Sequence, residues 1–230
     1  MPAAKLEGIA RTNLDSPNPT PPQLERRKKS IAIVKEMNLP WMDQLPVVED
    51  ETSFTPRTKE EVAERCIATT ITAVKGELHD SKVVGDLVAK FSAESFFSPQ
   101  ERKFINDPKP EQKELADYSW RYESSHVFLW ALGHLPRLNP PHQAADVKKV
   151  GEILMGSGRE LATKATLRSS SEILDQADLY YRLHWAVIEL RLKGKKSDRA
   201  DEEIIFERHR ALNWLIRYMN QAWDDVTTDT

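Results

Sequence analysis

Cysteine is nearly absent from this sequence, in which Cys66 is the only one among 230 residues. A disulfide framework and a cysteine-based zinc site both need more than one thiol, so both are excluded. Long apolar runs are missing as well, because the longest uninterrupted one is VFLWAL at 127–132. Such a run is too short for a membrane span or a secretory signal, and we therefore expect a cytoplasmic protein without membrane attachment.

An excess of charge of either sign is also missing. The 33 basic and 36 acidic side chains give a formal net charge of -3, so no overall field attracts nucleic acid or an anionic membrane. The one dense basic cluster, RRKK at 26–29, lies inside an amphipathic pattern, and we interpret it as a solvated helix face. Neither nucleic acid nor a membrane is predicted as a partner.

Strand-like alternation is almost absent, whereas helical periodicity recurs along the chain. Four segments begin with Ser or Thr followed three residues later by Glu or Gln, a capping box that satisfies free backbone N–H groups at a helix start. These pairs are Thr20 with Gln23, Thr58 with Glu61, Ser98 with Glu101, and Ser169 with Glu172. Gly133 and Gly194 stand where C-terminal helix caps are needed.

The pattern predicts an all-α fold with about eight helices. Their expected positions are 21–37, 58–75, 83–95, a short helix from 98, 111–132, 144–165, 169–193 and 202–222. Residues 38–56 carry three prolines and should cross the surface in extended form. Residues 1–20 are polar and proline-containing, which predicts a disordered leader before a single globular domain over 21–230.

Short motifs do not identify a chemistry. Glu123 and His126 have the Glu-x-x-His spacing of di-iron helix bundles, but those sites need a second copy of the motif, and none occurs. GSG at 156–158 follows a helical pattern rather than a strand, so it is not expected to cradle phosphate. The acids of DDVTTD at 224–229 have no partner cluster that would help to hold magnesium. We predict neither a metal site nor a cofactor.

Charges on apolar helix faces are a more informative signal. Arg208 lies near the centre of an apolar arc that includes Leu212, and Glu123 lies on an apolar face with Trp130. Because an unpaired buried ion costs several kcal/mol, such charges are expected to be paired. These two charges have opposite sign, so Glu123 is a natural partner for Arg208.

The predicted helix over 169–193 combines a broad apolar face with a narrow charged stripe. The stripe consists of Asp175, Asp178, Arg182 and Glu189. It is either a solvated ridge or a partly buried polar network that lines a groove, and the pattern leaves both interpretations open. His184 lies among apolar residues and is interpreted as a hydrogen-bonded core histidine rather than a ligand.

The burial of three further residues can be predicted in the same way, from their positions around each helix. Cys66 lies on an apolar face and should be a buried, inert thiol. Trp214 falls on the polar arc of the last helix and should be exposed. Trp223 should anchor the end of that helix in the core, so that the acidic tail folds back. We expect a tail acid to contact Arg208 or Arg182, and the candidates are Asp224, Asp225, Asp229 and the terminal carboxylate of Thr230.

Three stretches, SWRYESSHVFLWALG, LRSSSEILDQADLYYRLHWAVIE and FERHRALNWLIRYMNQAWDDVTTDT, together resemble a bacterial family catalogued as domain of unknown function 4272. The likeness extends from about residue 24 onward, and WDDVTTDT is its most specific element. The resemblance implies a soluble α-helical protein with no established activity. The positions that match are Trp120, Glu123, Trp130, Gly133, Arg168, Asp178, Arg182, Trp185, Glu207, Arg208, Asn213, Trp214, Trp223 and Asp225.

Two classes of function are compatible with these observations. The preferred one is a non-catalytic binding or regulatory module of the adaptor or immunity type, with another protein as its partner. The alternative is an acid–base enzyme, hydrolase-like, with carboxylates and histidine tuned by burial. A third class, nucleic-acid binding, would need a basic stripe that the helical patterns lack. The candidate binding or polar-network residues are Glu123, Arg168, Asp178, Arg182, His184, Glu207, Arg208, Trp214, Asp224 and Asp225.

Overall fold

Residues 18–230 are described by a computed structural model, so most of the leader predicted over 1–20 lies outside the described residues. Nine α-helices are present in this range: α1 (Pro21–Glu36), α2 (Lys59–Leu78), α3 (Ser81–Phe91), α4 (Pro99–Asn106), α5 (Gln112–Ser119), α6 (Arg121–Ala131), α7 (Val147–Ser157), α8 (Ser170–Leu192) and α9 (Glu202–Leu215). Short 3-10 helices follow at Ala93–Ser95 (η1), Gly158–Glu160 (η2), Tyr218–Asn220 (η3) and Trp223–Asp225 (η4). No strand occurs within residues 18–230, and the predicted all-α fold is confirmed.

The helix starts follow the sequence signals closely. All four predicted capping boxes form, at the N-termini of α1, α2, α4 and α8. Gly133 and Gly194 adopt left-handed backbone angles just after α6 and α8, with φ of 78° and 64°. A Cβ atom on Gly133 would lie 2.8 Å from the carbonyl oxygen of Thr166, so this turn requires glycine for space as well as for its backbone angle.

The helix predicted over 111–132 is in fact two helices, which accounts for nine helices where about eight were expected. α5 ends at Ser119 and α6 begins at Arg121, with Trp120 at the junction. The cause is a tertiary contact. A Cβ atom on Gly76 of α2 would lie 2.6 Å from the carbonyl oxygen of Leu115 in α5, so the two helix backbones touch at that glycine.

The last helix is shorter than predicted. α9 ends at Leu215 rather than near 222, because Arg217, Met219 and Asn220 adopt left-handed backbone angles that reverse the chain. Trp223 therefore reaches the core from η4, not from the end of a helix. It is nevertheless buried, as expected, with only 5% of its surface exposed.

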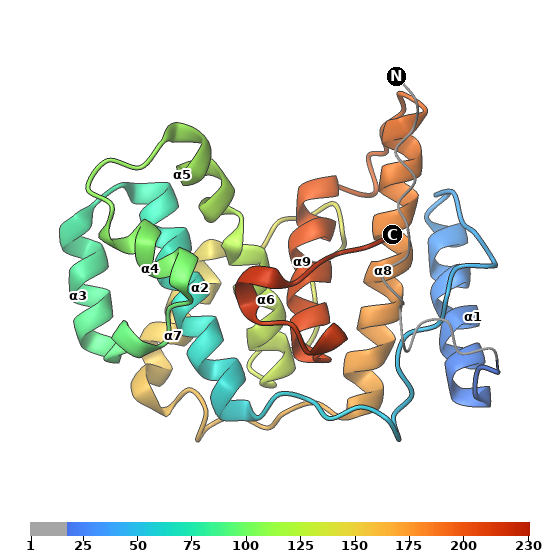
Figure 1. Cartoon of the computed structure of the whole chain (residues 1–230), viewed down its shortest axis with the longest axis horizontal. Helices are drawn as coiled ribbons and strands as arrows, with labels where there is room; N and C mark the ends of the chain where they lie inside the picture. The colour runs from blue at the N-terminus through green and yellow to red at the C-terminus, as the bar shows by residue number, and fades with distance from the viewer. Residues whose placement is uncertain (1–17) are drawn as a thin grey trace.

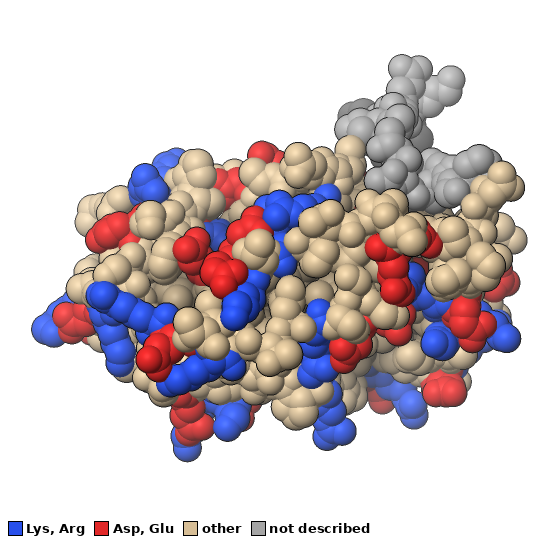
Figure 2. All heavy atoms as spheres, turned by 90° about the horizontal axis from the view of Figure 1, so that it is seen from below, with Lys and Arg blue, Asp and Glu red and all other residues tan. Residues whose placement is uncertain are grey.

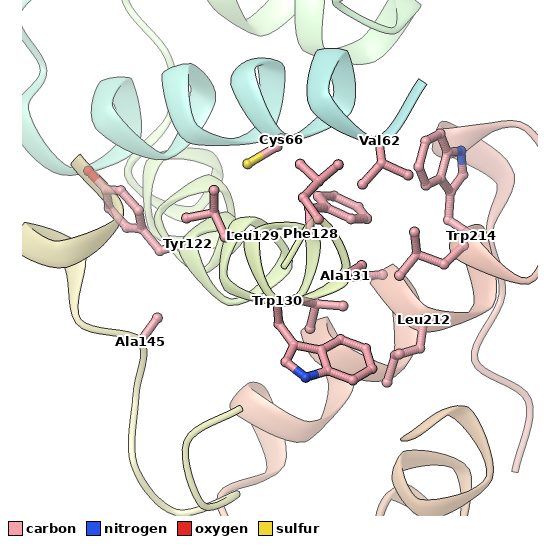
Figure 3. Packing of buried hydrophobic residues seen from close by; sticks show 14 of the residues in the cluster. Val62, Cys66, Tyr122, Phe128, Leu129, Trp130, Ala131, Ala145, Leu212 and Trp214 are labelled. Atoms are coloured by element: carbon pink, nitrogen blue, oxygen red, sulfur yellow. The ribbon is translucent and has the colours of Figure 1, made fainter. Parts of the chain in front are cut away.

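The core of the molecule is one continuous apolar cluster built around α2, α6 and α9. Figure 3 shows Val62 and Cys66 of α2 facing Phe128 and Leu129 of α6, whereas Trp130 lies on the side of α6 turned away from α2. Cys66 is fully buried, which confirms its predicted placement. Burial raises the pKa of its thiol, so the unreactive thiol form is favoured.

The remaining helices are arranged to either side of this centre. Figure 1 shows α1 packed along α8 at one end of the molecule and α3, α4 and α5 at the other, with α6 and α9 between them. No helix within residues 18–230 is long and apolar enough to cross a bilayer. Figure 2 shows basic and acidic side chains interspersed on the face that it presents.

The segment that links α1 to α2 is extended, as predicted, but it does not stay on the surface. Val47 and Val48 are buried, with 2% and 4% of their surface exposed, and the carbonyl oxygen of Val48 accepts a hydrogen bond of 2.6 Å from Gln23 of α1. Arg26 is buried as well and pairs with acids on two other segments. The interpretation of RRKK at 26–29 as a wholly solvated face is therefore wrong at its first residue.

Candidate functional site

A cleft of about 750 Å³ lies between α1, α8 and the loop that follows α6. This volume is in the range usual for ligand sites in proteins, about 300–1,000 Å³. Its apolar lining comes from α1, the end of α6, the loop that follows α6, and α8, and it includes Ile33, Met37, Trp130, Leu138, Leu179 and Leu183. Ile33 is 40% exposed, so part of the apolar wall is open to solvent.

The loop that forms one wall of the cleft has few backbone N–H donors of its own. Pro136, Pro140 and Pro141 have no N–H group to donate. Two arginines bind the loop's carbonyl oxygens instead. Arg208 donates to those of Asn139 and Gln143, at 2.6 and 2.9 Å, and Arg168 to those of Leu135 and Pro136, both at 2.9 Å.

Arg208 is completely buried and pairs with Glu123, as predicted from their positions on apolar faces. The Nε and Nη2 atoms of Arg208 each lie 2.8 Å from Oε2 of Glu123, and Nη1 donates to the Tyr180 hydroxyl at 2.8 Å. Burial lowers the pKa of Arg208, but Tyr180 and Glu123 raise it by more, so the guanidinium stays charged. The other oxygen of Glu123 accepts the backbone N–H of Ala145 at 2.6 Å.

Arg168 joins the same region from the start of α8. Its Nε donates to the carbonyl oxygen of Trp130 at 2.9 Å, and its Nη1 pairs with Glu172 at 2.7 Å. Its guanidinium also lies 4.9 Å from the centre of the Trp130 ring. Three of the sequence candidates, Glu123, Arg168 and Arg208, therefore converge behind one cleft wall.

The charged stripe of α8 is buried at its centre, and the solvated-ridge interpretation is wrong there. Asp178 and Arg182 are 0% and 2% exposed and form a two-bond ion pair at 2.8 and 2.9 Å. Arg182 also donates to the carbonyl oxygen of Pro46 at 3.1 Å, which ties the α1–α2 linker to α8. Of the stripe, only Asp175 lines the cleft, and it pairs with Arg26.

His184 is a buried, hydrogen-bonded core residue, as interpreted from the sequence. Its Nδ1 lies 3.0 Å from Nδ1 of His209, so one ring donates and the other accepts. Burial, followed by Arg191, lowers the pKa of His184 to about 4. Burial, followed by His184, also lowers the pKa of His209, so both rings are neutral at neutral pH.

The Glu-x-x-His pair points to no metal site. His126 accepts the backbone N–H of Asn139 at 3.2 Å, and burial followed by Arg208 lowers its pKa to about 4. Glu123 is occupied by Arg208 and Ala145. No group of three or more metal-ligating side chains occurs within residues 18–230.

Glu207 and Trp214 lie outside the cleft. Glu207 pairs with Arg121 and accepts from the Ser124 hydroxyl at 3.0 Å. The predicted exposure of Trp214 is wrong, because only 7% of its surface is exposed. Its ring makes edge contacts with Phe128 and Trp223, with centroids 5.4 and 6.0 Å apart, and these aromatic neighbours cover it.

The acidic tail is bound, but not by the predicted arginines. Asp224 accepts hydrogen bonds from the Ser98 hydroxyl and, at 3.0 Å, from the backbone N–H of Gln100. It therefore sits at the N-terminus of α4, where free N–H groups and the helix dipole favour an anion. No ion pair joins Asp224, Asp225 or Asp229 to Arg208 or Arg182. These two arginines pair instead with Glu123 and Asp178, respectively.

Sequence reasoning missed two parts of the site. Tyr180 is not among the candidates named from the sequence, yet its hydroxyl is a partner of Arg208 and the residue contributes to the cleft lining. The cleft wall itself was not predicted. Its sequence signal is the proline-rich stretch LPRLNPPHQ at 135–143, which follows directly on the buried end of α6.

Taken together, the fold and the cleft define an all-α protein with a preformed cleft, one wall of which is fixed by buried arginines. The model of the family described as Domain of unknown function (DUF4272) matches residues 26–226, and the chain therefore belongs to that family, as the resemblance implied. No match was found among curated proteins or among solved structures.

Proposed function

We propose that this protein is a non-catalytic binding module, of the adaptor or immunity type, whose cleft between α1 and α8 takes an apolar segment of a partner protein. The observation that carries the proposal is the open cleft of about 750 Å³, lined by apolar and polar side chains in similar measure, beside a loop held in place by Arg208 and Arg168. A wall that is already ordered lowers the entropy cost of binding.

The charges around the cleft suggest what the segment looks like. Arg168 pairs with Glu172, and Asp175 pairs with Arg26. Arg137 lines the cleft and forms no ion pair with any residue in 18–230. The best-matched segment therefore presents apolar side chains to α1 and α8 and one acidic group to Arg137.

The hydrogen bonding of the acid–base groups favours binding over catalysis. A general base needs a lone pair that can reach the substrate. Glu123 already accepts from Arg208 and Ala145, and His184 and His209 bind one another. These groups are better suited to holding the structure together than to transferring protons.

An acid–base enzyme is the second candidate, and one observation favours it. Glu123 lines a separate hollow of about 250 Å³ that also includes Tyr122 and Glu77. Turnover of any substrate that is lost in a folded Glu123→Gln variant, but kept in a Leu179→Arg variant, would favour this candidate over the binding module.

Photo-crosslinking in cells that produce the full chain tests the proposal. A photoreactive phenylalanine analogue is placed at Gln176 in the cleft and, as a control, at Met155 on α7, which is 49% exposed. We expect a discrete adduct from position 176 and none from position 155. The adduct partner, once purified, should bind the purified chain.

Two matched substitutions complete the test. Leu179→Arg places a charge in the cleft, whereas Met155→Arg places one on α7, and both variants are checked for folding by circular dichroism. Binding of the purified partner should be lost only with Leu179→Arg. Equal binding by the two variants, or the same adducts from both crosslinking positions, would overturn the proposal.

A further inference from the structure

A second cleft lies on another face, where the α5–α6 junction meets the start of α9. It has a volume of about 440 Å³ and is lined by Lys113, Asp117, Trp120, Arg121, Glu202, Glu203, Phe206 and Glu207. Trp120 and Phe206 are 36% and 41% exposed, so two large aromatic side chains line one open hollow. Exposed aromatic side chains gathered in this way are typical of binding sites.

The cleft is built on rigid elements. Trp120 stands at the junction of two helices, and its carbonyl oxygen accepts the backbone N–H of Glu123 at 2.9 Å. In the same lining, the Arg121–Glu207 ion pair is largely buried, and Ser124 donates a further hydrogen bond to Glu207 at 3.0 Å. These parts of the lining are thus fixed before any ligand arrives.

The lining has an excess of negative charge, with four carboxylates and two cationic side chains. Two of the carboxylates are already in ion pairs, because Glu207 pairs with Arg121 and Glu202 pairs with Arg191. Asp117 and Glu203 form no ion pair with any residue in 18–230. Lys113 is also in no ion pair within residues 18–230, so the unpaired side chains of the lining carry one net negative charge. A cationic ligand would therefore meet two unpaired carboxylates beside two aromatic rings.

We propose that this second cleft binds the guanidinium group of an arginine side chain presented by a partner polypeptide. A flat guanidinium can stack on an aromatic ring and donate paired hydrogen bonds to a carboxylate at the same time, and it loses water more readily than an ammonium group. The proposal rests on Trp120, Phe206, Asp117 and Glu203 alone, and it does not depend on the cleft between α1 and α8.

Three matched peptides test the chemistry of the ligand. The pentapeptide acetyl-Ala-Ala-Arg-Ala-Ala-amide is compared with peptides that carry lysine or citrulline at the centre, since citrulline keeps the shape of arginine without its charge. Binding is followed through the indole N–H signal of Trp120 in the NMR spectrum, assigned with Trp120→Phe. The indole of Trp41, which is 48% exposed and outside the cleft, reports non-specific contact.

We expect a saturable shift of the Trp120 signal with the arginine peptide, about tenfold weaker affinity for the citrulline peptide, and clearly weaker affinity for the lysine peptide. The Trp41 signal should not move. Equal affinity for arginine and citrulline would overturn the charge argument, and equal affinity for arginine and lysine would overturn the assignment to a guanidinium.

Variants of the lining test the site itself. Phe206→Ala and Glu203→Gln should each weaken arginine-peptide binding by about threefold or more, whereas Asp86→Asn, an exposed acid on α3, should leave it unchanged. All three positions are on the surface, so the folded state is expected to persist, and thermal unfolding checks this. Weakening by Asp86→Asn as large as that by Glu203→Gln would show general charge attraction and would sink the proposal.

Discussion

At the scale of single residues, the arginine at position 208 carries the clearest structural consequence. Its guanidinium contacts Glu123, the Tyr180 hydroxyl and two loop carbonyl oxygens while none of its surface is exposed. The arginine therefore joins α6, α8 and α9 to the wall of the cleft. Its removal should affect both stability and the shape of the site.

The first prediction concerns Arg208→Met. This change leaves Glu123 buried without its cation, and breaking a buried pair in this way costs about 3–5 kcal/mol of unfolding free energy. Lys82→Met is the matched control, because the Lys82–Asp86 pair is fully exposed to solvent and its loss should leave the unfolding free energy nearly unchanged. Urea unfolding of both variants measures the difference. A cost below about 1 kcal/mol for Arg208→Met would contradict the role assigned to the pair.

The second prediction concerns Cys66, whose thiol lies between α2 and α6 with no exposed surface. Burial raises the pKa of this thiol, so labelling by a disulfide reagent should wait for unfolding and should accelerate sharply in urea. The control is the double variant Cys66→Ser/Ser53→Cys, whose single thiol lies on the exposed linker between α1 and α2. This thiol should be labelled at once in the native state. Equal native labelling rates would contradict the buried placement.

A buried ion pair could be predicted from the sequence where each of its charges interrupts an apolar helix face. Arg208 and Glu123 each interrupt an apolar face, so their partnership was visible in the sequence. Trp214 was wrongly expected to be exposed, because a helical wheel assumes one buried and one solvated face. α9 is covered on more than one side, by α6, by α8 and by Trp223 of the returning tail.

At the scale of elements, the sequence predicted features that depend on neighbouring residues. It did not predict features that depend on contacts between distant segments. The four capping boxes depend on residues three positions apart, and all four form. The break at Trp120 depends on the contact between α5 and Gly76, and the cleft depends on a loop held by two distant arginines. Neither arrangement is encoded in a short stretch of sequence.

The third prediction belongs to the tail and α4. Asp224→Asn removes the carboxylate that accepts from Ser98 and Gln100, and the loss of such an N-terminal helix interaction should cost about 1 kcal/mol. Asp225→Asn is the control, because Asp225 is exposed and contributes a backbone hydrogen bond that the change retains. Thermal or urea unfolding should separate the two variants. Equal stabilities would show that the α4 contact contributes nothing.

At the scale of the whole molecule, the sequence predicted the fold class because helical periodicity and caps pointed the same way along the chain. The site was predicted only in part. Charges on apolar helix faces predicted a buried polar network. The cleft that this network supports depends on how α1, α8 and the loop pack together, and it was not predicted. A cleft is a property of packing between distant segments, and residue patterns along one helix do not specify it.

A last property of the whole molecule is its expected response to acid. Three buried histidines, His126, His184 and His209, are held neutral, and the pKa values of the first two are lowered to about 4. In the unfolded chain a histidine has a pKa of about 6.5. At pH 7 the folded state is neutral and the unfolded state is mostly so, and these groups therefore change the unfolding free energy only a little there.

The fourth prediction is that stability falls as the pH drops from about 6.5 to about 4. In this window the unfolded chain binds protons that the folded chain does not bind. Each such histidine lowers the unfolding free energy by up to about 1.4 kcal/mol per pH unit. Arg208 and Asp146 face His126, while Arg191 and His209 face His184. Urea unfolding at several pH values gives the slope. His126→Gln should make the slope shallower by up to one proton, and an unchanged slope in this variant would show that the fold does not hold this histidine neutral.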